Sequence, residues 1–263
     1  MRKWLALMAI YFQEGLAYRA NGIIWTLTDT VPAMIMPMVF IASAKTGNQI
    51  GGYTNSGIVQ YYLVMLVLTN FIVCHIMWEL AYEIRDGVFT PSLLRPVSYL
   101  DVCAIRNLAW RCLRLVYFAP AFIILIFFYR DYLVGSDLYF GWQSIAAVIL
   151  GHIVSFSLAY MLTMFALFFA EVQSIFGLYY FPLMFLSGQM FPIYLMPGWI
   201  VSVAKVLPFY YTTGLPLDII MRRIPLENAL VPLAVQVLWI LGHFAAAKLL
   251  WKYGLRQYAA VGM

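Results

Sequence analysis

Long apolar runs make up most of the chain, and short polar stretches separate them. A run of about 20 apolar residues can cross a bilayer as one helix. About six such runs follow one another, at 23–42, 58–78, 110–128, within 142–170, within 176–190 and at 229–250. The pattern therefore predicts an all-α integral membrane protein with six transmembrane helices. Pro32 and Pro37 lie inside the first run and predict a bent helix.

The segments between the runs differ in character. Residues 1–21 mix aromatic and aliphatic side chains with charged ones, which is typical of an amphipathic helix lying in the membrane interface. Residues 45–57 are rich in Gly, Asn, Ser and Thr and predict a loop. A tight turn around Glu171 is expected to join spans four and five into a hairpin. The whole chain, residues 1–263, is interpreted as one domain.

Residues 191–228 are apolar but interrupted too often for an ordinary spanning helix. Proline removes a backbone donor and distorts a helix. This region carries Pro192, Pro197, Pro208, Pro216 and Pro225. We therefore expect short or re-entrant helices on the outer side, between spans five and six.

Composition supports the membrane interpretation. The chain is 64% hydrophobic and 10% charged, whereas soluble domains carry about 25% charged residues. Cys74, Cys103 and Cys112 are odd in number and lie in or near apolar runs, so a disulfide framework is not expected. The net charge of +5 is interpreted as basic loops beside anionic membrane lipid, and no nucleic-acid partner is expected.

The basic residues also predict an orientation. Six spans place both termini on one side of the membrane, together with the connection after span two. Of the 16 Lys and Arg residues, the other side would hold only Lys45, Arg130, Lys205, Arg222 and Arg223. Cytoplasmic loops carry the excess of basic residues. We therefore expect both termini in the cytoplasm of a cell with a bacterial-type plasma membrane, with Arg111 and Arg114 reaching the headgroups from the start of span three.

Motifs for catalysis or metal binding are missing from the sequence. No G-x-x-x-x-G-K-[ST] phosphate loop occurs, so ATP would have to be bound by another chain. The histidines His75, His152 and His243 are isolated and are interpreted as packing or hydrogen-bonding residues. Asp29 lies inside span one, and we favour a position near the interface over a proton relay. No catalytic residue and no metal site is predicted, and the chain is not expected to be an enzyme.

The polar connection after span two, residues 83–100, is the most informative segment. Glu79, Glu83 and Asp86 fall at helical spacing beside Arg85, and Gly87 then breaks the helix. The following TPSLLRP places a leucine pair between two prolines. A short, rigid, charged element with an apolar tip indicates docking to another protein, although an ordinary solvated loop is the simpler alternative.

Two stretches resemble a known family. EIRDGVFTPSLLRPVSYL, residues 83–100, is similar to the coupling-helix region of type 2 ATP-binding cassette exporter permeases. LPFYYTTGLPLDII, residues 207–220, is similar to their segment before the last span. The resemblance implies a separate nucleotide-binding ATPase subunit, which would bind ATP and Mg, and a second permease chain, identical or related. It assigns contact with the ATPase to Glu83, Arg85, Asp86, Gly87, Leu93, Leu94, Arg95 and Pro96.

The resemblance also implies a substrate pathway between two permease chains. Aromatic and methionine side chains of spans two and five are its candidates, namely Tyr61, Tyr62, Tyr179, Tyr180, Phe181 and Met184. Helix packing and interfacial aromatic belts explain each of them equally well. The function expected is ATP-driven export of a hydrophobic or amphiphilic compound of the drug, natural-product, lipid or glycan class. The alternatives are a secondary carrier or channel without an ATPase, and a membrane-embedded enzyme.

Overall fold

A computed structural model describes residues 2–43, 49–50, 52–169 and 172–258. Within these residues five helical segments are long and apolar enough to cross a membrane. They are α2 (Arg19–Ser43), α3 with α4 (Asn55–Ile72 and Met77–Arg85), α6 (Tyr99–Phe128), α7 with the turn η2 (Trp142–Thr163 and Met164–Leu167) and α11 (Leu230–Gln257). Helix α8 (Gln173–Leu186) is also apolar but shorter than these five segments. The prediction of an all-α membrane protein is confirmed.

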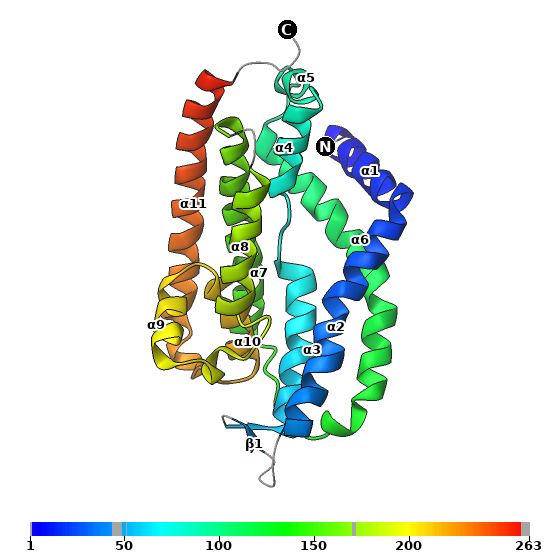
Figure 1. Cartoon of the computed structure of the whole chain (residues 1–263), viewed down its shortest axis with the longest axis vertical. Helices are drawn as coiled ribbons and strands as arrows, with labels where there is room; N and C mark the ends of the chain where they lie inside the picture. The colour runs from blue at the N-terminus through cyan, green and yellow to red at the C-terminus, as the bar shows by residue number, and fades with distance from the viewer. Residues whose placement is uncertain (1, 44–48, 51, 170–171, 259–263) are drawn as a thin grey trace.

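The long helices run side by side, and the short elements gather at the two ends of the bundle (Figure 1). Helix α1 (Arg2–Ala17), the tip helix α5 (Phe89–Leu93) and the last turns of α11 share one end. The opposite end holds an antiparallel hairpin, in which β1 (Gln49–Ile50) pairs with β2 (Tyr53–Thr54). Lys45 and Glu171, which the sequence places in a loop and a turn, lie outside the described residues.

The second span is not one continuous helix. Helix α3 ends at Ile72, and the backbone is irregular at Val73, Cys74 and His75 before α4 begins at Met77. The prediction of a single helix over 58–78 is therefore wrong in this respect. The interrupting residues include neither Gly nor Pro, so the cause of the break must come from elsewhere in the fold.

The third span begins earlier than the apolar run indicates. Helix α6 starts at Tyr99, where the side chain of Ser98 accepts a hydrogen bond of 3.1 Å from the Asp101 amide. Arg111 and Arg114 consequently lie about three to four turns inside the helix, and they are 7% and 3% exposed. The expectation that they reach the headgroups is wrong.

Small and polar residues let α2 approach its neighbours closely. Its buried positions are Gly22, Thr26, Thr30, Ala33 and Pro37, which repeat at helical spacing and face α3 and α6. The Thr26 hydroxyl donates to the Gly22 carbonyl at 2.8 Å, and the Thr30 hydroxyl donates to the Thr26 carbonyl at 2.7 Å. These polar groups are thus satisfied inside an apolar environment.

The region between α8 and α11 consists of short helices, as predicted. They are α9 (Gly198–Val206), the π-helical turn η4 (Tyr210–Gly214) and α10 (Leu215–Ile220), with the 3-10 turns η3 (Ile193–Leu195) and η5 (Leu226–Asn228). All of η4 and α10 is buried. Helix α7 packs chiefly along α11, while α8 contacts α4, α9 and η4.

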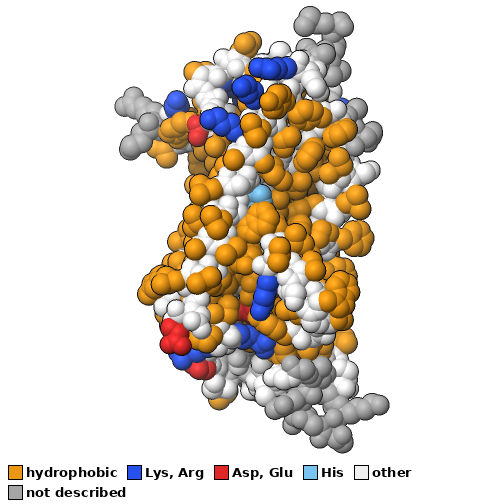
Figure 2. Space-filling model, turned by 90° about the vertical axis from the view of Figure 1, so that its left-hand side faces the viewer, with side chains coloured by type: hydrophobic (Ala, Val, Ile, Leu, Met, Phe, Trp, Pro, Cys, Tyr) orange, Lys and Arg blue, Asp and Glu red, His pale blue; other side chains and the backbone are white. Residues whose placement is uncertain are grey.

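The outer surface of the bundle is apolar over its middle. Figure 2 shows hydrophobic side chains covering the central part of one face, with charged side chains gathered toward its two ends. Helix α11 contributes Leu238 and Leu241 to this surface, exposed by 66% and 61%. Such a band is unfavourable in water and matches the hydrocarbon core of a bilayer.

Candidate functional site

The polar connection after the second span folds into a sharp turn. Helix α4 ends at Arg85, and Gly87 takes a φ of 72°, a conformation that costs other residues about 1–2 kcal/mol. The Val88 amide donates to the Glu83 carbonyl at 2.9 Å, and the Gly87 amide donates to the Ile84 carbonyl at 3.2 Å. This paired closure of a helix end is the Schellman motif, and it confirms the helix break predicted at Gly87.

The segment after Gly87 presents an apolar tip. Leu94 follows α5 directly and is 85% exposed, while Leu93 is 40% exposed. Arg85, Asp86, Arg95 and Pro96 are also exposed. An isolated leucine this exposed loses the stabilisation that burial of its side chain would give, about 1.5–3 kcal/mol.

The base of the tip is held by an aromatic cluster. Phe89 of α5 is fully buried, and its ring meets those of Tyr99, Trp251 and Tyr258 edge to face, with centroids 5.8, 6.0 and 5.1 Å away. The hydroxyls of Thr90 and Tyr258 are 3.0 Å apart and share a hydrogen bond. The tip is therefore fixed to the start of α6 and to the end of α11.

Glu83 faces the protein interior rather than the exposed tip. Arg106 of α6 donates to Glu83 at 2.9 Å and to Glu79, one turn earlier on α4, at 2.8 Å. The Glu83 side chain is only 14% exposed, and the Arg106 guanidinium also lies over the ring of Tyr11 from α1. Glu83 therefore joins α4 to α6 and does not lie with Arg85 and Asp86.

Arg111, a second arginine of α6, explains the break in the second span. Its guanidinium donates to the backbone carbonyls of Asn70 and Val73 and lies 3.3 Å from the Cys74 sulfur. Carbonyls released at a helix end need donors when no water is present. Arg111 supplies them, and its positive charge also suits the negative end of the α3 dipole.

Helix α7 completes the support of the break. The Ser155 hydroxyl accepts from the Cys74 amide at 2.9 Å. His152 has its Nδ1 3.1 Å from the Ile72 carbonyl and its Nε2 3.1 Å from the Asn107 amide nitrogen. A neutral imidazole protonated at Nδ1 satisfies both contacts. His152 is thus a hydrogen-bonding residue, as its isolation in the sequence indicates.

Arg114, a third arginine of α6, is buried like Arg111 and binds Asp29. The Arg114 guanidinium forms an ion pair with the Asp29 carboxylate on α2, and the two side chains are 4% and 23% exposed. Asp29 therefore has a charged partner within the chain, and its position near the membrane interface stays a prediction. A pair of opposite charges on separate spans was the signal in the sequence that could have linked them.

Three of the tyrosines proposed for the pathway belong to the core of the chain. Tyr61 and Tyr62 are 2% and 1% exposed, and their hydroxyls donate to the carbonyls of Gly188 and Met190 at 2.6 and 3.0 Å. Tyr179 is 6% exposed. Tyr61 and Tyr62 fasten the segment after α8 to α3, which is the packing role left open by the sequence.

The other three pathway candidates lie at or near the surface of α8. Phe181 is 67% exposed and Met184 is 40% exposed. Tyr180 is partly buried, and its hydroxyl lies 2.7 Å from His75 Nδ1 in the irregular segment of span two. The structure therefore separates the six candidates into three buried tyrosines and three partly or fully exposed residues of α8, and it brings Tyr180 next to the helix break.

A buried carboxylate organises the short helices at the end of the bundle that holds the hairpin. Asp218 of α10 is 2% exposed and accepts from the hydroxyls of Tyr210 and Tyr194 at 2.7 and 2.8 Å. Burial raises the pKa of the Asp218 carboxyl, while these two hydroxyls and the charge of Arg223 act in the opposite direction. Asp218 lies between Leu217 and Ile219 in the segment 207–220, and this apolar setting is the signal in the sequence that could have identified it.

Metal-binding chemistry has no support within the described part of the chain. No group of three or more His, Cys, Asp or Glu side chains that could hold a metal ion occurs among these residues. Cys74, Cys103 and Cys112 are free thiols.

These features define a class of protein: a helical membrane protein whose polar connection between the second and third spans is fastened to α6 and α11. The family model of the ABC-2 family transporter protein matches residues 26–262. The chain belongs to this family of membrane transport components. The family implies an ABC transporter that works with an ATPase partner. No curated protein and no solved structure matches the chain.

Proposed function

We propose that the chain is the membrane subunit of an ATP-driven exporter and that a separate ATPase subunit docks on residues 85–96. The observation that carries this proposal is Leu94, a leucine exposed by 85% at the end of a short helix. The tip is fastened to α11 through Phe89, and the α4 helix before it is fastened to α6 through Arg106. A partner that moves this tip would move helices that cross the membrane, whereas a flexible loop would transmit nothing.

The cargo in this proposal is a hydrophobic or amphiphilic compound, and the pathway forms where two permease chains meet. Phe181 and Met184 support a lining role for α8 because they are large, apolar and exposed on the isolated chain. Tyr180 would connect this lining to the break in span two. Tyr61, Tyr62 and Tyr179 are left out of the pathway because they are buried within one chain.

The docking proposal is tested by co-expressing the tagged chain with each ABC-type ATPase of its own genome and isolating the complex in detergent. We expect one ATPase to co-purify with the wild-type chain, and Leu94→Asp or Arg95→Glu to abolish its recovery. Val134→Asp and Arg130→Glu are matched controls, because Val134 is 83% exposed and Arg130 is 65% exposed in the connection after α6. Both controls should retain the ATPase.

A transport assay in liposomes distinguishes the proposed ATP-driven exporter from a secondary carrier. The isolated chain and its complex with the ATPase are reconstituted in liposomes with a fluorescent amphiphilic dye. Movement that requires both the ATPase and ATP supports the proposal. Movement at full rate by the chain alone, without ATP, would show that the chain is a carrier or channel.

A further inference from the structure

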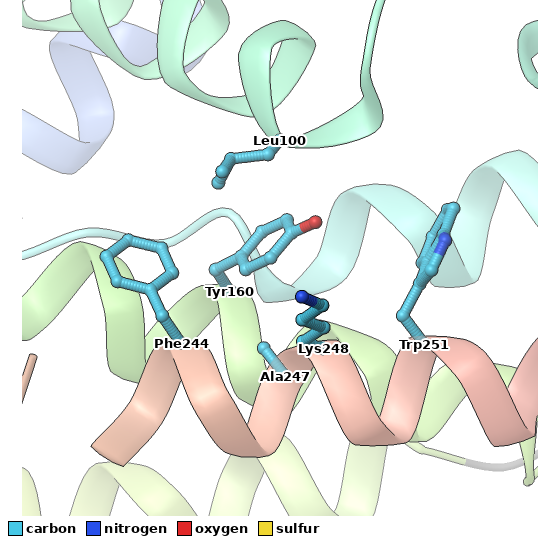
Figure 3. A pocket seen from close by; sticks show the side chains of 6 residues that line it. All are labelled: Leu100, Tyr160, Phe244, Ala247, Lys248 and Trp251. Atoms are coloured by element: carbon cyan, nitrogen blue, oxygen red, sulfur yellow. The ribbon is translucent and has the colours of Figure 1, made fainter. Parts of the chain in front are cut away.

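A hollow opens on the side of the bundle beneath the tip helix α5. It has a volume of about 380 Å³ and is lined by Leu100 at the start of α6, Tyr160 of α7, and Phe244, Ala247, Lys248 and Trp251 of α11 (Figure 3). A second hollow of about 340 Å³ adjoins it and shares Leu100, Tyr160 and Trp251 with the first. Volumes of about 300–1,000 Å³ are typical of sites that hold small molecules.

The two hollows differ in polarity. The first is walled by apolar and aromatic side chains, among them Phe244, and by Lys248, while the second, which lies at the tip beside Leu93, adds the hydroxyl-bearing Ser92 and Ser98. Lys248 lines the first hollow, and its ammonium points into the space beside Tyr160, a residue that both hollows share (Figure 3). The shape therefore suits a molecule with an apolar tail and a polar head.

Among the residues that line the first hollow, Lys248 alone is charged. Lys248 forms no ion pair with any residue that the structure describes. Lys248, Lys252 and Arg256 repeat every four residues on α11, so that they form a basic row toward its end. Leu249, the next residue, is 57% exposed on the apolar outer surface. The hollow thus opens beside an exposed apolar surface of α11, at the start of its basic row.

We propose that this hollow binds one anionic phospholipid of the adjacent leaflet, with its phosphate on Lys248 and an acyl chain along Tyr160 and Phe244. Basic pockets between transmembrane helices are recurrent sites for anionic headgroups. The bound lipid would contact Leu93, because this residue lines the second hollow. It would also contact Trp251, which packs against Phe89 at the base of the tip. The lipid would therefore support the segment that carries Leu94.

The site is tested on the full chain alone, so the result does not depend on the ATPase. The chain is purified from vesicles of phosphatidylcholine mixed with phosphatidylglycerol, and bound lipids are counted by native mass spectrometry. We expect retention of one phosphatidylglycerol, and about a fivefold loss of its affinity in Lys248→Ala. Lys248→Arg should keep most of the binding. Lys252→Ala, one turn away and outside the hollow, is the matched control and should bind like the wild type.

Two further measurements, thermal unfolding and competition with inorganic phosphate, test whether the variant folds and whether the ligand is a lipid. In pure phosphatidylcholine, the Tm of Lys248→Ala should match that of the wild type, which shows that the variant folds normally. Added phosphatidylglycerol should raise the Tm of the wild type but not that of Lys248→Ala. Inorganic phosphate at equal concentration should not displace the lipid, because the tail contributes to binding. Equal retention of phosphatidylglycerol by wild type and Lys248→Ala, or equal retention of both lipids, would overturn the proposal.

Discussion

Arg106 and Arg111 lie little more than one turn apart on α6 and hold neighbouring parts of the second span by different means. Arg106 binds the side chains of Glu79 and Glu83 on α4, the helix that leads to the exposed tip. Arg111 binds the backbone carbonyls of Asn70 and Val73 where the second span is interrupted. The first contact depends on the identity of its partners. The second depends on the path of the chain, so no exchange of side chains can reproduce it.

The largest effect is expected from Arg111→Leu. The change leaves at least two backbone carbonyls without donors in a dry interior, at a cost of about 3 kcal/mol in the free energy of unfolding. Arg111→Lys should recover part of this loss, because one ammonium cannot span both carbonyls. Unfolding in mild detergent measures both variants. If Arg111→Leu is as stable as the wild type, Arg111 does not support the break.

A smaller effect, about 2 kcal/mol, is expected from Arg106→Glu, which places a third carboxylate beside Glu79 and Glu83. Adding Glu83→Arg should restore most of the loss, as a double-mutant cycle on unfolding would show. No such exchange of charges is available for Arg111, because its partners are backbone carbonyls. Failure of Glu83→Arg to rescue would mean that the Arg106 contact depends on local geometry, and the contrast between the two arginines would disappear.

Asp29→Asn should cost about 1.5 kcal/mol, because Arg114 then keeps its charge in the interior without an anion. The cost is smaller than for a fully buried pair because the Asp29 side chain is 23% exposed. The exchange of both partners, Asp29→Arg with Arg114→Asp, tests whether the pair behaves like Arg106 or like Arg111. Recovery of stability in the exchanged protein would show that the Asp29–Arg114 pair, like the Arg106 contact, depends on the identity of its two partners. A double variant less stable than either single variant would show that the position of the guanidinium matters more than the pairing.

The smallest effect, about 1 kcal/mol, is expected from Gly87→Ala. A Cβ at Gly87 meets no atom within 4 Å, so only the backbone conformation is strained. Gly87→Asn should lose less, since Asn tolerates this conformation better. Both are measured by unfolding and by recovery of the ATPase. A loss of ATPase recovery larger than the loss of stability would indicate that the direction of the tip is set at Gly87.

The sequence predicted those parts of the fold that depend on local composition. The spans follow from apolar length, and the end of α4 follows from Gly87 after a charged turn. The irregular segment Val73–Cys74–His75 gave no signal, because its cause is Arg111, which lies far along the chain. The apolar run starts at residue 110 whereas α6 starts at Tyr99, so the sequence placed Arg111 and Arg114 too close to the start of the helix. The sequence likewise does not show whether a tyrosine in an apolar run, such as Tyr61, lies in the core or on a pathway, because packing alone decides this.

The guanidinium of Arg111 occupies the kind of place where ion-coupled carriers with interrupted helices hold a mobile cation. Here the cation is covalently part of the protein and stays charged at every physiological pH. It cannot be released to either side of the membrane, so an ion gradient has nothing to exchange at this break. An ion-coupled carrier built on this chain would therefore need the site for its coupling ion at another place.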